Sequence, residues 1–301
     1  MTERVYYGGQ AVIEGVMMRG RKTAVTAVRH PNGEMVMKAQ PLSSLYTSRL
    51  RRTPFLRGVI VLIEAMVLGI QSLLYSANVS LEEEEVEISG KTVWLIITVS
   101  LALAVGLFFI APLFITKTLD PYIKSSVVFH LIEGLIRLGI FIIYLKLVTL
   151  SSDIKRIFSY HGAEHKTVNA YEAGVPLEVE SVKKYSTAHV RCGTSFLMAV
   201  LVIAIVVFAL IGRPALWLMI LLRIILIPLI AALGYEVTYF GGRHIKNSIV
   251  RTILAPGLWL QALTTREPDD SQLEVAISAL NKVIELEEAE KSTQPVSLPA
   301  S

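Results

Sequence analysis

The sequence predicts an all-α membrane protein with about four transmembrane helices, one further interfacial or re-entrant helix, and a small α+β cytoplasmic region. The 301-residue chain is 53% hydrophobic and 18% charged, with a mean hydropathy of +0.55. This balance is too apolar for an ordinary soluble domain. The apolar residues form stretches about as long as the roughly 20 residues that cross a bilayer as a helix. Most basic residues lie between these stretches.

Residues 1–55 are predicted to form an N-terminal cytoplasmic segment. Two strand-like runs, residues 22–29 and 34–39, are separated by the sequence HPNG, which has the composition of a hairpin turn. Before this hairpin, four glycines surround Glu14 and Arg19. Glycine permits positive φ angles or close backbone approach. We therefore expect this segment to bring Glu14 and Arg19 into a functional site.

Residues 56–92 are predicted to hold an interfacial helix followed by an acidic linker. The first part of the segment is apolar, but Arg57, Glu64 and Gln71 recur every seven residues and fall on one helical stripe. Such a stripe favours a helix that lies in the membrane interface or is re-entrant. A fifth full span is the alternative, and it would place the N-terminal segment on the opposite face. The acidic run at 82–87 is interpreted as a solvated linker.

Four stretches are long and apolar enough to cross the bilayer. The first contains no charged residue over 24 positions, and the third contains none over 18. They are grouped into a first transmembrane pair within residues 93–150 and a second within residues 195–236. The stretches themselves cover residues 93–116, 125–150, 195–212 and 214–235.

The second and fourth of these stretches carry ionisable residues. His130, Glu133 and Arg137 lie three to four residues apart on one helical face, and Arg223 interrupts the last stretch. Because charges inside a membrane are expensive, they usually face a bundle interior or a water-filled cavity. One interpretation is a polar cavity that leads to a cytoplasmic site. The other, which we favour, is a Glu133–Arg137 pair that holds helices together.

The distribution of basic residues predicts the orientation of the chain. Residues 1–92, 151–194 and 237–301 hold 23 of the 29 lysines and arginines. The positive-inside rule places these segments, and with them both termini, in the cytoplasm. The single Cys192 cannot form an intrachain disulfide, which agrees with a reducing compartment. No cleaved signal peptide is expected. Anionic lipid explains the pI near 9.1, so a nucleic-acid partner is not predicted.

Residues 237–290 are predicted to form a cytoplasmic C-terminal segment. Trp259 is expected at headgroup level, and residues 271–274 have the pattern of a capping box. The helix that follows is amphipathic, so its apolar face must dock on this chain or on a membrane-protein partner. Residues 291–301 are interpreted as a disordered tail. The apolar face comprises Leu273, Ile277, Leu280 and Ile284.

The loop at 151–194 carries the motif that points most directly to chemistry. His161 and His165 are four residues apart, so on a helix their rings project from the same face. Two imidazoles at this spacing can bind one metal ion, usually zinc. Glu164 completes the order His-x-x-Glu-His of inverted zincins, in which a carboxylate beside the metal accepts the proton of the attacking water.

The same loop offers further ligands in His189 and Cys192. A set of His161, His165 and His189 leaves a fourth position open, as catalysis requires, whereas adding Cys192 closes the site and makes it structural. Both sets remain open at this point. Soluble inverted zincins also use a distant glutamate, for which Glu236 is the nearest analogue. A nucleophilic role of Cys192 with His189 as base is weighed against capping of the next helix by Ser and Thr, and capping is favoured.

Four sequence motifs resemble those of the YqhQ-like family, bacterial multi-pass membrane proteins with a domain of unknown function that are described as predicted metal-dependent enzymes. They span nearly the whole chain and show no departure from the family pattern. The resemblance implies a metal-dependent activity, although this label derives from the same His and Cys motifs, and it implies no substrate. The motifs are GGQAVIEGVMMR at 8–19, YHGAEHKT at 160–167, HVRCGTSF at 189–196 and TTREPDD at 264–270.

Two functional hypotheses follow. The first is a zinc-dependent membrane hydrolase in which Glu164 activates water, Glu14 and Arg19 enter the site, and Arg19 binds an anionic group of the substrate. The second is a non-enzymatic accessory or scaffold factor for membrane-protein insertion or assembly, whose metal is structural and includes Cys192 as a ligand. A transporter is less well supported, because no inverted repeat is recognisable in four spans.

Overall fold

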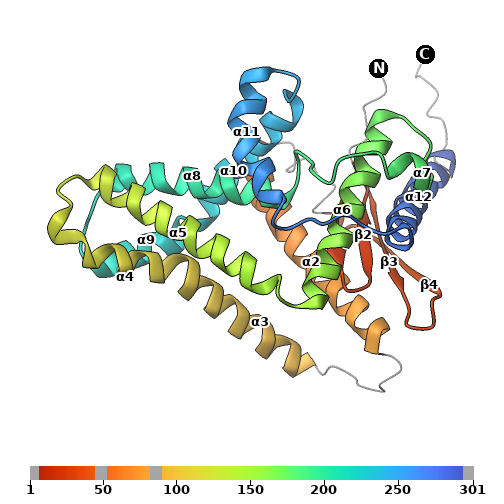
Figure 1. Cartoon of the computed structure of the whole chain (residues 1–301), viewed down its shortest axis with the longest axis horizontal. Helices are drawn as coiled ribbons and strands as arrows, with labels where there is room; N and C mark the ends of the chain where they lie inside the picture. Colours follow the sequence, from red (N-terminus) through yellow and green to blue (C-terminus); the bar gives the residue numbers. More distant parts are fainter. Residues whose placement is uncertain (1–6, 45–52, 82–89, 294–301) are drawn as a thin grey trace, which may run out of the picture.

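The computed structural model describes residues 7–44, 53–81 and 90–293, which form an apolar helical bundle and a sheet unit (Figure 1). The sheet is antiparallel, in the order β1-β2-β3-β4. Its second hairpin confirms the predicted strands, whereas the first is built from the glycine-rich segment for which no strand was predicted. Gly15 is needed there, because a Cβ would overlap the Ala27 carbonyl oxygen of the next strand. The strands are β1 (Gly8–Val12), β2 (Gly15–Arg19), β3 (Thr23–Arg29) and β4 (Met35–Pro41).

Helices α6 (Ser152–Ala173), α7 (Val179–Val182) and α12 (Asp270–Thr293) complete the sheet unit. Side chains of β2, β3, α6 and α12 share one buried core. The predicted apolar face of α12 belongs to this core, since Leu273 and Leu280 are fully buried. Of the two alternatives for this face, docking on this chain or on a membrane-protein partner, the structure shows the first: the face is occupied within the chain.

The ends of α12 also differ from the prediction. Asp269 and Gln272 cap the helix reciprocally: the Gln272 amide donates to Asp269 Oδ1 (2.8 Å) and the Asp269 amide donates to Gln272 Oε1 (3.1 Å). The cap therefore lies two residues before the predicted box at 271–274. The helix continues to Thr293, beyond the predicted boundary at residue 290, and the rest of the tail lies outside the described residues. The predicted linker at 82–87 lies outside them as well.

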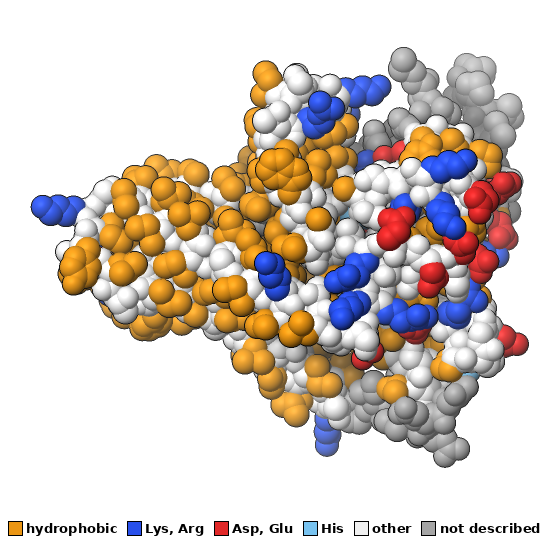
Figure 2. All heavy atoms as spheres, in the orientation of Figure 1, with side chains coloured by type: hydrophobic (Ala, Val, Ile, Leu, Met, Phe, Trp, Pro, Cys, Tyr) orange, Lys and Arg blue, Asp and Glu red, His pale blue; other side chains and the backbone are white. Residues whose placement is uncertain are grey.

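The apolar bundle contains three of the four predicted spans as unbroken helices. The first runs over the 29 residues Gly90–Thr118 and includes a π-helical turn, and its outer surface is largely hydrophobic (Figure 2). The fourth is broken, because Pro228 lacks the amide hydrogen that would continue the helix. Its two halves meet at an angle of 48°. The elements are α3 (Gly90–Val105), η3 (Gly106–Ile110), α4 (Ala111–Thr118), η4 (Asp120–Tyr122), α5 (Ser126–Val148), α8 (Gly193–Ile211), α9 (Leu216–Ile225) and α10 (Ile227–Arg243).

Helix α2 (Leu56–Leu81) lies between the sheet and the bundle (Figure 1). Its polar face contacts the sheet: Ser72 Oγ lies 3.1 Å from Thr26 Oγ1, and Ser76 Oγ accepts the Ile13 amide at 3.2 Å. Ile63, on the opposite face of the helix, is 46% exposed. This two-sided character favours the interfacial interpretation. The length of the helix would also suffice for a span, so that four helices, or five with the bent pair, are long and apolar enough to cross a membrane.

The ionisable residues of the bundle form one buried cluster around Glu133. Arg137 donates to Glu133 Oε1 at 2.8 Å, and Arg223 Nε lies 3.2 Å from the same oxygen. His130 Nδ1 lies 3.2 Å from the other carboxylate oxygen. Arg137 also donates to the carbonyl of Phe108 (2.8 Å), which lies in the π-helical turn η3. These contacts tie α5 to α9 and to η3, which is the helix-holding arrangement favoured for the Glu133–Arg137 pair.

Candidate metal centre

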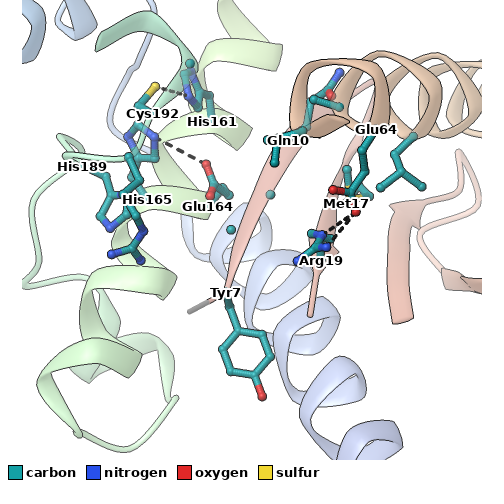
Figure 3. Close-up of a pocket in the computed structure, with 17 residues that line it drawn as sticks. Tyr7, Gln10, Met17, Arg19, Glu64, His161, Glu164, His165, His189 and Cys192 are labelled. Carbon is teal, nitrogen blue, oxygen red and sulfur yellow. Dashed lines mark hydrogen bonds and ion pairs between the residues drawn. The ribbon is translucent and has the colours of Figure 1, made fainter. Parts of the chain in front are cut away.

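The motif HGAEH lies in the middle of α6, where the helical repeat places both imidazoles on one face. The turn before α8 brings Cys192 against this face (Figure 3). One ligand atom each from His161, His165 and Cys192 lies within 4.8 Å of the others. His165 and Cys192 are buried, and His161 is partly buried. Two imidazole nitrogens and one sulfur thus converge on one point.

Backbone carbonyl groups fix the orientation of both imidazole rings. His161 Nδ1 donates to the carbonyl of Thr264 (2.8 Å), and His165 Nδ1 donates to the carbonyl of Thr187 (2.6 Å). Because a carbonyl oxygen only accepts, these contacts assign the hydrogen to Nδ1. The Nε2 lone pairs of both rings then remain for a ligand. An imidazole held in this way by an outer hydrogen bond is typical of metal sites.

Cys192 occupies the N-cap position of α8. Its Sγ accepts the amide of Thr194 (3.4 Å) and lies 3.3 Å from His161 Nε2. The cap is therefore the thiol, and not the Ser and Thr hydroxyls that were expected to provide it. The positive end of a helix stabilises a thiolate, and a thiolate is the form that binds metal.

Gln261 holds the turn that carries Cys192. This fully buried side chain is the last residue of α11 (Ser248–Gln261). Its Oε1 accepts the His189 amide (2.9 Å), and its Nε2 donates to the His189 carbonyl (2.8 Å) and to Ser195 Oγ (2.6 Å). All donors and acceptors of one buried amide group are thus used on the segment 189–195. This role of Gln261 was not predicted from the sequence.

The segment after α11 crosses α6 at Gly162. The Arg266 amide donates to the carbonyl of Phe158 (2.9 Å), and a Cβ on Gly162 would overlap the Arg266 carbonyl oxygen. Glycine at this position therefore lets the TTREPDD segment approach the helix closely. The approach brings the Thr264 carbonyl to His161.

We expect Gly162→Ala to destabilise the protein. An added methyl group must displace the Arg266 backbone, and overpacking of this kind costs about 1–3 kcal/mol. Differential scanning calorimetry in detergent measures the effect. Gly139→Ala is the matched control, because a Cβ there meets nothing within 4 Å and alanine is the better helix former. Equal unfolding temperatures for the two variants would contradict the packing described.

Glu164 projects from α6 beside the imidazole cluster. Its carboxylate is buried, and Oε2 lies 3.5 Å from His165 Nε2. The space for this side chain is provided by Gly9 of β1, because a Cβ there would lie 3.0 Å from Glu164 Cγ. The glycine-rich segment thus contributes to the site through close backbone approach. The close approach confirms one of the two roles considered for its glycines.

A cavity of about 220 Å³ extends from the cluster toward α2 and the first hairpin. Arg19 and Glu64 form its opposite wall (Figure 3). Two nitrogens of Arg19 donate to Glu64 Oε1, at 2.7 and 2.9 Å. Arg19 therefore lies in the cavity, as predicted. Glu64 was not predicted as a site residue, although it was noted as one of the polar residues that recur every seven positions on α2.

Other predicted residues lie outside the group of three. Glu14 lies at the β1–β2 turn, with a φ angle of 52°. Its carboxylate forms an ion pair with Arg156 and accepts a hydrogen bond from the Tyr160 hydroxyl (3.3 Å), and it does not line the cavity. Glu236, the analogue of a third ligand, pairs with Arg57. His189 lines the cavity, but its Nε2 lies 3.6 Å from Glu172 Oε2. Its ring centroid is 5.7 Å from that of His165.

Glu172 anchors this outer part of the site and makes it sensitive to acid. Burial raises the pKa of Glu172, but its contacts with His189 and Arg191 outweigh burial and lower the pKa to about 2. The ordinary pKa of a glutamate side chain is 4.5. Because the pKa in the folded protein is lower, the ionised Glu172 carboxylate stabilises the fold at pH values above 4.5. We expect the contribution to be lost as the pH falls from about 4.5 toward 2. Chemical denaturation across this range measures it. Glu172→Gln should flatten the pH dependence, while the exposed control Glu180→Gln should leave it unchanged.

Comparison with known proteins identifies the family. A family model described as a protein of unknown function, DUF1385, matches residues 53–286. The chain belongs to this family. The uncharacterized protein YqhQ of Bacillus subtilis (strain 168) is 34% identical over 305 residues, covering 97% of this chain and 96% of that protein. The resemblance predicted from the four motifs is confirmed. No solved structure matches the chain.

Proposed function

We propose that the chain is a zinc-dependent hydrolase of the bacterial inner membrane, with its site on the cytoplasmic face. The observation that carries this proposal is the convergence of His161, His165 and Cys192 within 4.8 Å beside the Glu164 carboxylate. The cytoplasmic assignment rests on the positive-inside rule, because the sheet unit is built from the segments rich in lysine and arginine.

The residues present fit a zinc ion. In a tetrahedral site, Zn–N bonds of 2.0–2.1 Å and a Zn–S bond of 2.3 Å place ligand atoms about 3.4–3.6 Å apart. The Cys192 Sγ to His161 Nε2 distance of 3.3 Å is close to that spacing. Imidazole and thiolate together select zinc over magnesium or calcium. Since His189 faces Glu172, an ion here would be held by His161, His165 and Cys192 alone. Three protein ligands would leave it the open coordination position that catalysis requires, which supports a catalytic site over a closed structural one.

Zinc, when bound, supplies a Lewis acid that polarises the scissile group and favours ionisation of water. Glu164 accepts the proton of the attacking water and returns it to the leaving group. Arg19, across the cavity, binds an anionic or strongly polar part of the substrate, and Glu64 fixes the plane of its guanidinium group. Glu14 has no part in these steps, because it is paired with Arg156 at the far end of the hairpin.

A second candidate function is nucleophilic catalysis by Cys192. The supporting observation is the 3.3 Å contact between its Sγ and His161 Nε2, with the Thr264 carbonyl orienting the ring. Iodoacetamide labelling distinguishes the two functions: a nucleophile stays reactive in zinc-saturated protein, whereas a zinc ligand is protected. The non-enzymatic scaffold is less well supported, because the α12 face expected to bind its partners is buried.

The hydrolase is tested by incubating zinc-loaded protein with a bacterial polar lipid extract. Untargeted mass spectrometry compares the reaction with and without the chelator 1,10-phenanthroline. We expect a substrate to be consumed while two products form whose combined mass exceeds that of the substrate by one water molecule, and we expect the chelator to stop this conversion. A zinc-saturated, folded protein that shows no such conversion in lipid, soluble-metabolite or peptide extracts would contradict the proposal.

A further inference from the structure

A second cavity, of about 360 Å³, lies within the helical bundle. It is lined by η3, α5, α8 and α10, by Leu62 of α2 and by Leu260 of α11. Every lining side chain except Arg137 is apolar. The Arg137 guanidinium group is already used by Glu133 and by the Phe108 carbonyl, so it does not require an anionic ligand. The cavity therefore offers almost exclusively hydrocarbon contacts.

The two cavities adjoin each other at α2 and at the start of α8. Val61 lines the polar cavity and the next residue, Leu62, lines the apolar one. Likewise Gly193 lines the polar cavity, and Phe196, one helical turn further along α8, lines the apolar one. Helices α2 and α8 therefore contribute side chains to both cavities.

This arrangement indicates an amphipathic ligand. An apolar cavity without polar partners does not hold ordered water, and at membrane depth the available apolar ligand is a lipid chain. The polar cavity supplies the opposite chemistry through Arg19, Glu164 and the imidazole cluster. The combined volume of the two cavities lies in the range of about 300–1,000 Å³ that is typical of small-molecule sites.

We propose that the substrate of this hydrolase is a long-chain acyl ester whose chain occupies the apolar cavity and whose carbonyl group lies at the His161, His165 and Cys192 cluster. The inference rests on the proposed function. Water adds to the carbonyl carbon while Glu164 takes its proton, the bond from that carbon to the ester oxygen breaks, and the leaving alcohol receives the proton. The products are a long-chain fatty acid, which retains the cavity contacts, and an alcohol that leaves through the polar cavity.

Chain binding is tested with palmitate, the product-like probe, by native mass spectrometry of detergent-purified protein. Leu201 lines the apolar cavity, whereas Leu210 on the same helix is 83% exposed. Leu201→Trp fills the cavity, and we expect it to lower palmitate occupancy about tenfold. Leu210→Trp makes the same substitution on the outer surface and should bind palmitate like the wild type. Equal occupancy in both folded variants would overturn the inference.

Hydrolysis of p-nitrophenyl esters, from acetate to palmitate, separates this inference from the proposed function. We expect the specificity constant of the zinc-loaded wild type to rise with chain length, and Leu201→Trp to remove the preference for long chains. Hydrolysis that is independent of chain length in the wild type would overturn the acyl-chain inference and leave the hydrolase standing. The protein could also hydrolyse none of these esters and yet bind palmitate in a way that Leu201→Trp abolishes. That result would support the chain cavity and count against the hydrolase.

If Leu201→Trp does not fold, a competition experiment on the wild type replaces it. Palmitate that competes with long-chain but not with short-chain esters supports the inference, and palmitate that competes with neither overturns it.

Discussion

Glu164→Gln is expected to lower the rate of hydrolysis by a factor of about 10²–10⁴, the usual contribution of a positioned general base. The amide has nearly the shape of the carboxylate, so the packing of Glu164 against Gly9 is preserved. Glutamine cannot accept the proton of the attacking water. The imidazole rings and Cys192 are unchanged, so zinc content and unfolding temperature should remain at wild-type values.

The matched control for this variant is Glu180→Gln, which replaces an exposed carboxylate in the same sheet unit. The rate is measured on the substrate found in the lipid extract, with zinc content determined on the same sample. If the Glu164→Gln protein keeps both its zinc and full activity, another group must accept the proton of the attacking water. Loss of zinc in this variant would show instead that Glu164 is a ligand.

Glu133→Ala is expected to destabilise the bundle by about 3–5 kcal/mol, the cost of breaking a buried ion pair and leaving charge unpaired. Arg223 and Arg137 both face this one carboxylate, and Glu133 and Arg223 are each only 2% exposed. Removing the carboxylate leaves two guanidinium groups in an apolar surrounding. Unfolding in mixed micelles with increasing dodecyl sulfate measures the effect.

Lys146→Ala provides the control, because it removes an exposed charge from the same helix. We expect that variant to unfold within about 0.5 kcal/mol of the wild type, as surface substitutions usually do. Replacing Glu133, Arg137 and Arg223 together by methionine should recover much of the lost stability, since a well-packed apolar set often matches a buried ionic one. Similar losses for Glu133→Ala and Lys146→Ala would contradict the buried cluster.

The spans and the second hairpin could be predicted because their signals are local. Charge-free stretches of span length and the HPNG turn each lie within one continuous piece of chain. The first hairpin escaped prediction because its strands are five residues each and rich in glycine. The break at Leu226 was missed because one proline in an apolar stretch does not by itself distinguish a kinked span from a broken one.

The imidazole pair of the site was predictable from its spacing on one helix, and Cys192 was one of two further candidate ligands, but the choice between Cys192 and His189 was not predictable. Whether His189 or Cys192 faces the imidazole pair depends on how Gln261, 72 residues after His189, holds the turn. The partner of Arg19 likewise comes from Glu64, 45 residues away on another element. Contacts at such separations depend on how the elements pack, and the order of residues along the chain does not specify them.

Zinc content tests the central claim most directly. Elemental mass spectrometry of detergent-purified protein compares the wild type with His161→Ala/His165→Ala and with His189→Ala, whose imidazole lies outside the group of three. We expect about one zinc ion per chain in the wild type and in His189→Ala, and none in the double variant. A folded wild type that stays empty after zinc reconstitution would contradict a metal centre, and loss of zinc in His189→Ala would contradict the ligand set proposed for it.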